Sequence, residues 1–365
     1  MILVGILTEY IKVNCMYTDP FLKIGNIKIG NKFKPIIIAE IGINHGGSLM
    51  LAKKMALLAI KSGAEIIKYQ THIVDDEMSI EAMKIIPDNS KISIYKLMEK
   101  CALSEKEELE LKSFVESKKA VFLSTPFSRK AALRLKKLGV SAYKIGSGEC
   151  NHLPLVDLVA SFNKPMIVST GMNNFNDINE TVKILEKHKI QYALLHCTNV
   201  YPTPPELVRL NCITEMKKKY KKAVIGYSDH TINNNACISA MALGAKIVER
   251  HFTDTKLRKG PDIINSMDPN ELKNLSKAAK EIFLMNKNNT KGIVRQEKNV
   301  SRFAFATVVT IKDIKKGEKF SYENIWAKRP GTGKIKASKI FNIIGKKANK
   351  NIRKDKHLNL IDIKF

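Results

Sequence analysis

Two histidines, His230 and His251, occupy equivalent places in neighbouring segments of the chain. Each closes an apolar run, VIGYSDH in the first case and KIVERH in the second, and a helical stretch (INNNACISAMALGA) lies between them. A strand, a helix and a strand of this length form a right-handed βαβ unit whose strands are parallel neighbours. The two strand ends then lie side by side, so both imidazoles can converge on one ion. The alternative is a pair of unrelated surface histidines.

Imidazoles with carboxylates and water around them favour a borderline divalent cation. We therefore predict that His230 and His251 bind a divalent metal, Mn²⁺ first, with Mg²⁺ or Co²⁺ as alternatives. Zinc would need a third protein ligand, and none is obvious. Three competing ligands rank lower: His45 and His72 lie just past strand ends, and His196 is followed by several more strand residues.

Charged side chains recur toward the ends of the apolar runs, namely Glu40, Lys68, Lys144 and, in the same run as His251, Glu249. Both lysines lie inside β-like runs, which favours burial over a surface position. Two lysines with nearby hydroxyls and an asparagine suit an anionic substrate that carries a phosphate and a carboxylate. Glu40 and Glu249 are either partners for these lysines or acid–base groups, and the sequence does not separate the two roles.

These side chains need a scaffold that brings eight strand ends to one rim. Eight apolar runs follow one another between residues 34 and 252, separated by helical stretches such as Leu49–Lys61, Ser104–Lys118 and Arg129–Leu138. This alternation predicts a parallel sheet, and eight repeats fit a closed (β/α)8 barrel with its active site at the C-terminal rim. A doubly wound sheet is the alternative, but the glycine-rich phosphate fingerprint is missing. The alternating segment Phe21–Phe33 predicts a hairpin that plugs one barrel end.

Composition limits the classes of partner. The net charge is +27, but the lysines are spread over many helix faces without an arginine-rich arm, so we predict no nucleic-acid partner. No apolar stretch approaches the ~20 residues that span a membrane, and the apolar first seven residues lack the flanks of a signal peptide. The 6 cysteines form no CxxC pair, which favours reduced thiols and a cytoplasmic location. Met16 is an alternative start.

Nine motifs follow one another along the chain: AEIGINHGG, KYQT, STPFS, YKIGSGE, STGMN, LLHCTNVYPTP, IGYSDHT, ERHFTD and KGPDIINSMDP. Together, and in this order, they resemble the sialic acid synthases. The resemblance runs from about Phe21 to the C-terminus. It implies a (β/α)8 enzyme that condenses phosphoenolpyruvate with N-acetylmannosamine to give N-acetylneuraminate and phosphate. C3 of phosphoenolpyruvate would attack the open-chain aldehyde, water would add at C2, and phosphate would leave by C–O cleavage.

The same resemblance implies roles for individual residues. Glu40 matches an acidic residue near the reacting carbons, and Glu249 points the same way as His251 in a strand, toward the substrate or the shell of the metal. The metal on His230 and His251 would polarise the aldehyde. Phosphoenolpyruvate would be held by Lys68, Thr125, Lys144, Ser147, Ser169, Asn199 and Ser228. The positions around the amino sugar are Gln70, Asn89, Glu149, Tyr201 and Asp262, the last in a Gly-Pro-Asp turn.

A second domain is expected after the barrel. Residues 299–365 resemble the antifreeze-like (SAF) domain of these synthases and carry 17 Lys and Arg against 5 Asp and Glu, a net charge of +12. Arg329, in a KRPGTG turn, matches an arginine that reaches into the partner's barrel, which implies a domain-swapped homodimer; without the family it would be an ordinary loop arginine. Phe303 is expected near the acetyl group of the sugar. The predicted parts are an extension with a capping hairpin (1–33), the barrel (34–285), a linker (286–298) and the SAF domain (299–365).

Two other functions stay open. The same reaction on a 2,4-diacetamido precursor of legionaminic or pseudaminic acid would differ in a few pocket side chains, because one methyl or hydroxyl changes discrimination by only ~1–3 kcal/mol. The GPDIINSMDP run favours the N-acetylneuraminate members. A basic binding module on a degenerate barrel predicts missing catalytic groups, whereas every matched position is filled. Tyr69 stands where phenylalanine is common in the family.

Overall fold

The computed structural model describes residues 19–87, 90–287 and 290–364. They belong to two compact units, one up to residue 288 and one from residue 289. In the described part of the chain, every helix is too short or too polar to cross a membrane.

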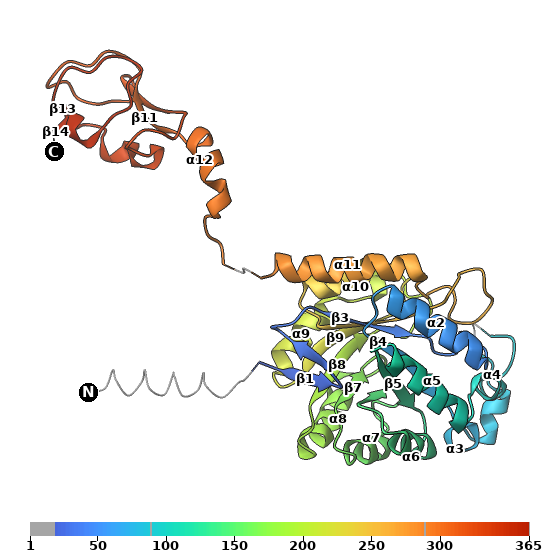
Figure 1. The fold of residues 1–365 in the computed structure, drawn as a ribbon. Coiled ribbons are helices and arrows are strands. Elements are labelled where there is room, and N and C mark those ends of the chain that lie inside the picture. Colours follow the sequence, from blue (N-terminus) through green and yellow to red (C-terminus); the bar gives the residue numbers. More distant parts are fainter. Residues whose placement is uncertain (1–18, 88–89, 288–289, 365) are drawn as a thin grey trace, which may run out of the picture. The chain divides into compact units, whose positions relative to one another are not determined.

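Eight parallel strands form the centre of the first unit (Figure 1). They are β3 (Ile36–Glu40), β4 (Ile66–Thr71), β5 (Val121–Pro126), β6 (Tyr143–Ile145), β7 (Met166–Ser169), β8 (Tyr192–Cys197), β9 (Val224–Asp229) and β10 (Ile247–His251). The hydrogen-bonded order is β5-β4-β3-β10-β9-β8-β7-β6, and β5 also lies beside β6. Strands β3 and β10, the first and last of the series, pair with His251 opposite Glu40. The predicted (β/α)8 barrel is confirmed, and a doubly wound sheet is ruled out.

Helices follow the strands and cover the outside of the barrel (Figure 1). The three helices predicted from the sequence are confirmed as α2 (Leu49–Lys61), α5 (Glu105–Ser117) and α6 (Arg129–Leu138). Serine side chains cap the N-termini of all three, and Gly139 ends α6 with φ of 68°. The others are α3 (Val74–Glu77), α4 (Ile94–Cys101), α7 (Leu153–Ala160), α8 (Phe175–Lys187), α9 (Asn211–Lys219), α10 (Asn235–Ala242) and α11 (Pro269–Met285), with short 3-10 turns η1 (Ile80–Lys84) and η2 (Pro205–Leu207).

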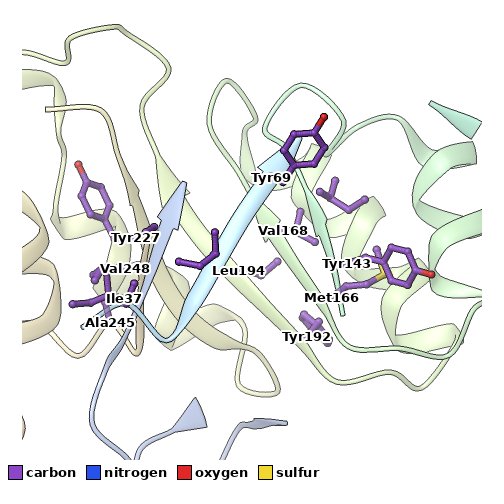
Figure 2. Close-up of a cluster of buried hydrophobic side chains, with 14 of the residues drawn as sticks. Ile37, Tyr69, Tyr143, Met166, Val168, Tyr192, Leu194, Tyr227, Ala245 and Val248 are labelled. Atoms are coloured by element: carbon purple, nitrogen blue, oxygen red, sulfur yellow. The ribbon is translucent and has the colours of Figure 1, made fainter. Parts of the chain in front are cut away.

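Side chains of the barrel strands alternate between two faces, as the two-residue period of a strand requires. One set packs outward against the helices, including Ile37, Tyr69, Tyr143, Val168, Leu194, Tyr227 and Val248 (Figure 2). The other set forms a separate apolar cluster inside the barrel, including Ile36, Ile38, Ile66, Leu123, Ile167, Leu195 and Ile247. This inner cluster fills the half of the barrel where the strands begin. Polar residues take over the same parity near the strand ends.

The hairpin predicted at Phe21–Phe33 is confirmed as β1 (Phe21–Ile24) and β2 (Ile27–Gly30), which pair antiparallel. Leu22, Ile24 and Ile29 are fully buried and belong to the inner cluster of the barrel. The hairpin therefore plugs the N-terminal end of the barrel.

The second unit is small and has its own core. It contains η3 (Arg295–Glu297), α12 (Lys298–Ala304), the antiparallel pair β11 (Thr307–Thr310) and β12 (Ile325–Lys328), η4 (Ala337–Asn342), η5 (Leu360–Asp362), and the pair β13 (Lys347–Ala348) and β14 (Ile363–Lys364). Its apolar cluster includes Val308, Ile314, Phe320, Ile325, Ile340, Leu358 and Ile363. The division at residues 288 and 289 falls inside the segment 286–298 predicted as a linker, and η3 with the start of α12 takes up the end of that segment.

Replacement of Ile29 by alanine tests the plug. The side chain fills the inner cluster, and Ile→Ala cavities in such cores lower the free energy of unfolding by about 2–5 kcal/mol. We expect a loss of about 3 kcal/mol in urea denaturation of the barrel. Lys28, the neighbouring exposed residue on β2, provides the control: Lys28→Ala should change the free energy by less than about 0.5 kcal/mol. Equal effects would contradict the plug.

Candidate active site

Four charged side chains from four strands meet inside the C-terminal mouth of the barrel. Glu40, Lys68, Lys144 and Glu249 are each at most 5% exposed. The Glu249 Oε1 atom lies 3.2 Å from the Lys68 Nζ atom and 3.6 Å from the Lys144 Nζ atom, and Glu40 forms a second ion pair with Lys68. All four occupy the inward parity of their strands. The structure thus brings the four charged sequence candidates together, and we refer to them as the charged cluster.

The electrostatics of the charged cluster follow from burial and mutual contact. Burial lowers the pKa of Lys68 to about 8; the like charge of Lys144 acts in the same direction and Glu249 opposes it. Burial alone would raise the pKa of Glu249, but Lys144 and Lys68 outweigh it and lower that pKa to about 2. Glu249 is therefore an ionised partner for the lysines at neutral pH. Lys68 has both glutamates as close partners, whereas the carboxylate oxygen paired with Lys144 is 3.6 Å away, which leaves the Lys144 ammonium suited to a further anion.

Hydroxyl and amide groups surround the charged cluster. Lys144 donates to the Ser169 hydroxyl at 2.7 Å, and Ser228 donates to Glu249 at 3.2 Å. The Ser147 hydroxyl accepts the backbone N–H of Gly171 at 3.1 Å. Thr125 is 1% exposed, and its hydroxyl has no hydrogen-bond partner among the described residues. A buried hydroxyl without a partner costs free energy unless a ligand or water satisfies it.

The second group of site residues lies beside the charged cluster. A Cβ on Gly42, whose φ is 44°, would lie 2.9 Å from Glu40 Oε1, 3.4 Å from Gln70 Nε2 and 3.5 Å from His251 Nδ1. These three polar atoms therefore converge on one glycine.

Burial raises the pKa of Glu149 to about 7 and the pKa of Asp262 to about 6. Carboxyl groups whose pKa values lie near neutral pH are candidates for acid–base chemistry.

The two histidines predicted as metal ligands lie together at the barrel mouth. Their ring centroids are 5.6 Å apart, and the Tyr201 ring lies 4.0 Å from that of His230. The Nδ1 atom of His230 contacts the Thr198 carbonyl oxygen at 2.9 Å, which leaves its Nε2 atom for a ligand. His251 Nδ1 is buried and lies 3.6 Å from Asp262 Oδ2, and no described residue forms a hydrogen bond with it.

This donor set fits a divalent ion held by two imidazoles, with oxygen ligands from water or substrate. Across the described residues, no group of three or more His, Cys, Asp or Glu side chains is arranged to bind a metal ion. A closed structural zinc site therefore does not fit the described site, because such a site takes four protein ligands.

A buried ion pair on the opposite strand face fixes the alignment of the two histidines. Arg250 and Asp229 are direct partners in the β9–β10 register and point outward, with the Arg250 Nε atom 3.5 Å from Asp229 Oδ2. Arg250 also donates at 2.8 Å to the Thr231 carbonyl oxygen and at 2.8 Å to the Asn234 side chain. Asp229 accepts from the Thr231 backbone N–H at 2.9 Å. The loop after His230 is thereby fastened to the strand that carries His251.

Three predicted positions are not placed in this site. Asn89 lies outside the described residues. Arg329 and Phe303 are exposed residues of the second unit, so their predicted contact with a barrel stays a prediction. The low rank given to His196 as a ligand is explained by its outward position, where its Nε2 atom contacts the Val208 carbonyl oxygen at 2.8 Å.

The sequence interpretation missed several residues. Cys197 has the inward parity and is 2% exposed, with its sulfur 3.8 Å from His230 Nδ1 and 3.3 Å from the Asn199 side-chain oxygen. The alternation along YALLHC could have revealed it. Arg250 and Asp229 each stand next to a predicted site residue in the sequence. Nothing in their spacing indicated that they would form an ion pair with each other on the outward face of β9 and β10.

The Arg250–Asp229 pair gives a stability prediction. Arg250→Met leaves a buried carboxylate without its cationic partner, and breaking a buried ion pair from one side costs about 3–5 kcal/mol. We expect a loss of this size in the free energy of unfolding. Lys183→Met, which breaks an exposed pair with Glu180, is the matched control and should cost less than about 1 kcal/mol. A small effect of both substitutions would show that the pair does not hold the strands.

Comparisons with known proteins give the family. A model of the NeuB family matches residues 55–291, and a model of the SAF domain matches residues 305–358. The N,N'-diacetyllegionaminic acid synthase of Campylobacter jejuni is 37% identical over 332 residues, which cover 88% of this chain and 98% of that protein. The N-acetylneuraminate-9-phosphate synthase of Homo sapiens is 30% identical over 331 residues, which cover 90% and 92%.

A crystal structure of N-acetylneuraminic acid synthetase from Leptospira borgpetersenii, in complex with citrate, matches with a TM-score of 0.72 at 30% identity and covers 78% of this chain and 96% of that one. A pseudaminic acid synthase of Campylobacter jejuni is 33% identical over 339 residues, which cover 91% of this chain and 97% of that protein. The family expected from the motifs is confirmed: the chain belongs to the NeuB family of sialic, legionaminic and pseudaminic acid synthases and carries a C-terminal SAF domain.

Proposed function

We propose that the protein condenses phosphoenolpyruvate with an N-acylated amino sugar to give a sialic acid-type product and phosphate. The observation that carries this proposal is the charged cluster, in which two desolvated lysines share Glu249 at the mouth of the barrel. An additional anion beside them would replace the water that their ammonium groups have lost. The solved relative at 30% identity was crystallised with citrate, a small polyanion, which supports an anion site in this fold.

Phosphoenolpyruvate would bind between the lysines and the hydroxyls. Lys68 and Lys144 would pair with its phosphate and carboxylate, while Thr125, Ser147, Ser169, Asn199 and Ser228 would donate hydrogen bonds. The unpartnered Thr125 hydroxyl is the clearest single donor, because a substrate oxygen would remove its burial cost. Glu249 would keep both lysines charged and in place.

The acceptor sugar would lie on the side of Gln70, Glu149, Tyr201 and Asp262. C3 of phosphoenolpyruvate would form a bond to the aldehyde carbon, and the aldehyde oxygen would take up a proton. Glu149 and Asp262 are the acid candidates, because burial raises the pKa of each carboxyl toward neutrality. Glu40, next to Lys68, would accept a proton from the water that adds at C2, and loss of phosphate by C–O cleavage would give the product. A divalent ion on His230 and His251, Mn²⁺ by expectation, would polarise the aldehyde when bound.

Two acceptors are candidates. N-Acetylmannosamine is the one expected from the motifs. A 2,4-diacetamido sugar is the second candidate, supported by 37% identity to an N,N'-diacetyllegionaminic acid synthase over 98% of its length, against 30% for the N-acetylneuraminate-9-phosphate synthase. Both sugars would use the same charged cluster and the same bond changes.

The second unit suggests how the open mouth is covered. We propose a cytoplasmic, domain-swapped homodimer in which Arg329 of one chain reaches the barrel of its partner and Phe303 contacts the acyl group of the sugar. Both side chains are exposed on their own unit, which leaves them accessible for a contact with the barrel of a second chain. Coverage would exclude water before the acceptor binds.

Phosphate release tests the proposed function. Chelator-stripped protein is given phosphoenolpyruvate with N-acetylmannosamine, or with a 2,4-diacetamido sugar, each with and without Mn²⁺. We expect Mn²⁺-dependent release with one of the two sugars and none without a sugar, and the active sugar identifies the acceptor. Folded protein that releases no phosphate in any mixture would contradict the synthase. The same sample should sediment as a dimer, and a monomer would contradict the domain swap.

The pKa of Lys68 gives a pH prediction for the same assay. Below about pH 8 the ammonium is charged and can bind the substrate phosphate; above it the charge is lost. The value of kcat/KM for phosphoenolpyruvate should therefore fall by about tenfold per pH unit above pH 8. Lys68→Arg keeps its charge in this range, so its residual activity should lack this alkaline limb. A limb that persists in Lys68→Arg would assign the titration to another group.

A further inference from the structure

A chain of three polar side chains runs from α3 to the barrel mouth. The His72 Nδ1 atom lies 2.8 Å from the Glu77 Oε2 atom, and the His72 Nε2 atom lies 3.2 Å from the Gln70 Oε1 atom. The His72 and Glu77 side chains are 4% and 9% exposed. The His72 ring also stacks on Phe127, with centroids 4.5 Å apart and an angle of 11° between the rings. The imidazole is therefore held on both edges and on one face.

In the structure the Gln70 oxygen faces His72 and the Gln70 nitrogen faces the site. Both ring nitrogens of His72 face oxygen atoms, so both contacts are hydrogen bonds when the ring donates two protons. The Gln70 oxygen is then occupied, and its NH₂ group points the other way. That nitrogen is one of the three atoms that converge on Gly42, together with Glu40 Oε1 and His251 Nδ1. An unsupported amide could turn over and present its oxygen instead.

We propose that Glu77 and His72 are positioning residues that fix the Gln70 amide so that it donates hydrogen bonds to the acceptor sugar. The group recognised is an oxygen acceptor on the sugar, either a hydroxyl oxygen or the carbonyl oxygen of an N-acyl group. This inference rests on the proposed function and assigns its acceptor selectivity to two residues that need not touch the substrate. The Glu77 carboxylate stabilises a ring that donates from both nitrogens, because it accepts a hydrogen bond from the Nδ1 atom.

The location of His72 and Glu77 makes the effect on sugar binding separable from the effect on phosphoenolpyruvate binding. The lysines of the charged cluster lie on β4 and β6, whereas His72 and Glu77 follow β4 in the segment that leads into α3. The loss of the His72 contact should therefore weaken sugar binding and leave phosphoenolpyruvate binding unchanged. A purely structural role in that segment would lower stability and affect both substrates.

His72→Asn is the most specific variant. The asparagine NH₂ can take the place of the Nδ1–H group and keep Glu77 paired, while nothing replaces the contact with Gln70. We expect the KM and the Kd for the accepted sugar to rise about fivefold, the loss of roughly one hydrogen bond, with an unchanged KM for phosphoenolpyruvate. Glu77→Gln should act in the same direction; it also removes a charge that raises the pKa of Glu149, so the asparagine variant is the cleaner one. Glu81→Gln, at an exposed residue of η1, is the control and should change neither constant.

A double-mutant cycle with Gln70→Ala decides between positioning and structure. If His72 acts through the Gln70 amide, His72→Asn should have less than a twofold further effect on sugar binding in the Gln70→Ala background. A full fivefold effect in that background, or an equal rise in the KM for phosphoenolpyruvate, would overturn the inference. Glu77→Gln enters the same cycle if His72→Asn does not fold.

The readout separates this inference from the proposed function. Sugar binding is measured by calorimetry with N-acetylmannosamine and with a 2,4-diacetamido sugar, independently of phosphate release. A wild-type protein that binds a sugar but releases no phosphate would contradict the synthase and still allow the cycle to be completed. A wild-type protein that binds neither sugar would overturn the inference itself.

Discussion

The ion pairs between Glu249 and the two buried lysines constrain the rest of the site. Ammonium groups removed from water are costly unless an opposite charge lies close to them. Glu249 meets this requirement for Lys68 and Lys144 from a third strand. Such a contact needs strands whose ends converge around a shared axis. The closed barrel provides that geometry, and the hairpin plug fills the opposite end with apolar side chains.

The ion pairs of Glu249 also depend on the register of β10, because the register decides which side chains of this strand face the barrel axis. Because side chains alternate along a strand, a shift of one residue in β10 would turn Glu249 and His251 away from the axis and bring Arg250 into it. The buried pair of Arg250 with Asp229, on the outer face, opposes such a shift. The residues that face the helices thus keep the residues that face the substrate in place.

The eight apolar runs that alternate with helical stretches were enough to predict the barrel, and the polar residues at the ends of these runs gave most of its inward polar side chains, among them Glu40, Lys68 and His251. The two-residue alternation applied to Cys197 would have found it. The contact between His72 and Gln70 was not predictable, because it depends on a rotamer and on the path of the segment into α3, where no periodicity applies. The pair of Arg250 with Asp229 was not predictable either, since the alternation along β10 places Arg250 opposite to Glu249 and His251 but does not give its partner.

The most direct test of the central claim is calorimetric titration of phosphoenolpyruvate into the protein without metal or sugar. The charged cluster is preformed, so we predict saturable binding with one site per barrel. We also predict that this binding is lost in Lys144→Met and kept in His230→Asn. Absence of binding to the wild-type protein, or binding that survives in Lys144→Met, would contradict the assignment of the buried lysines as the anion site.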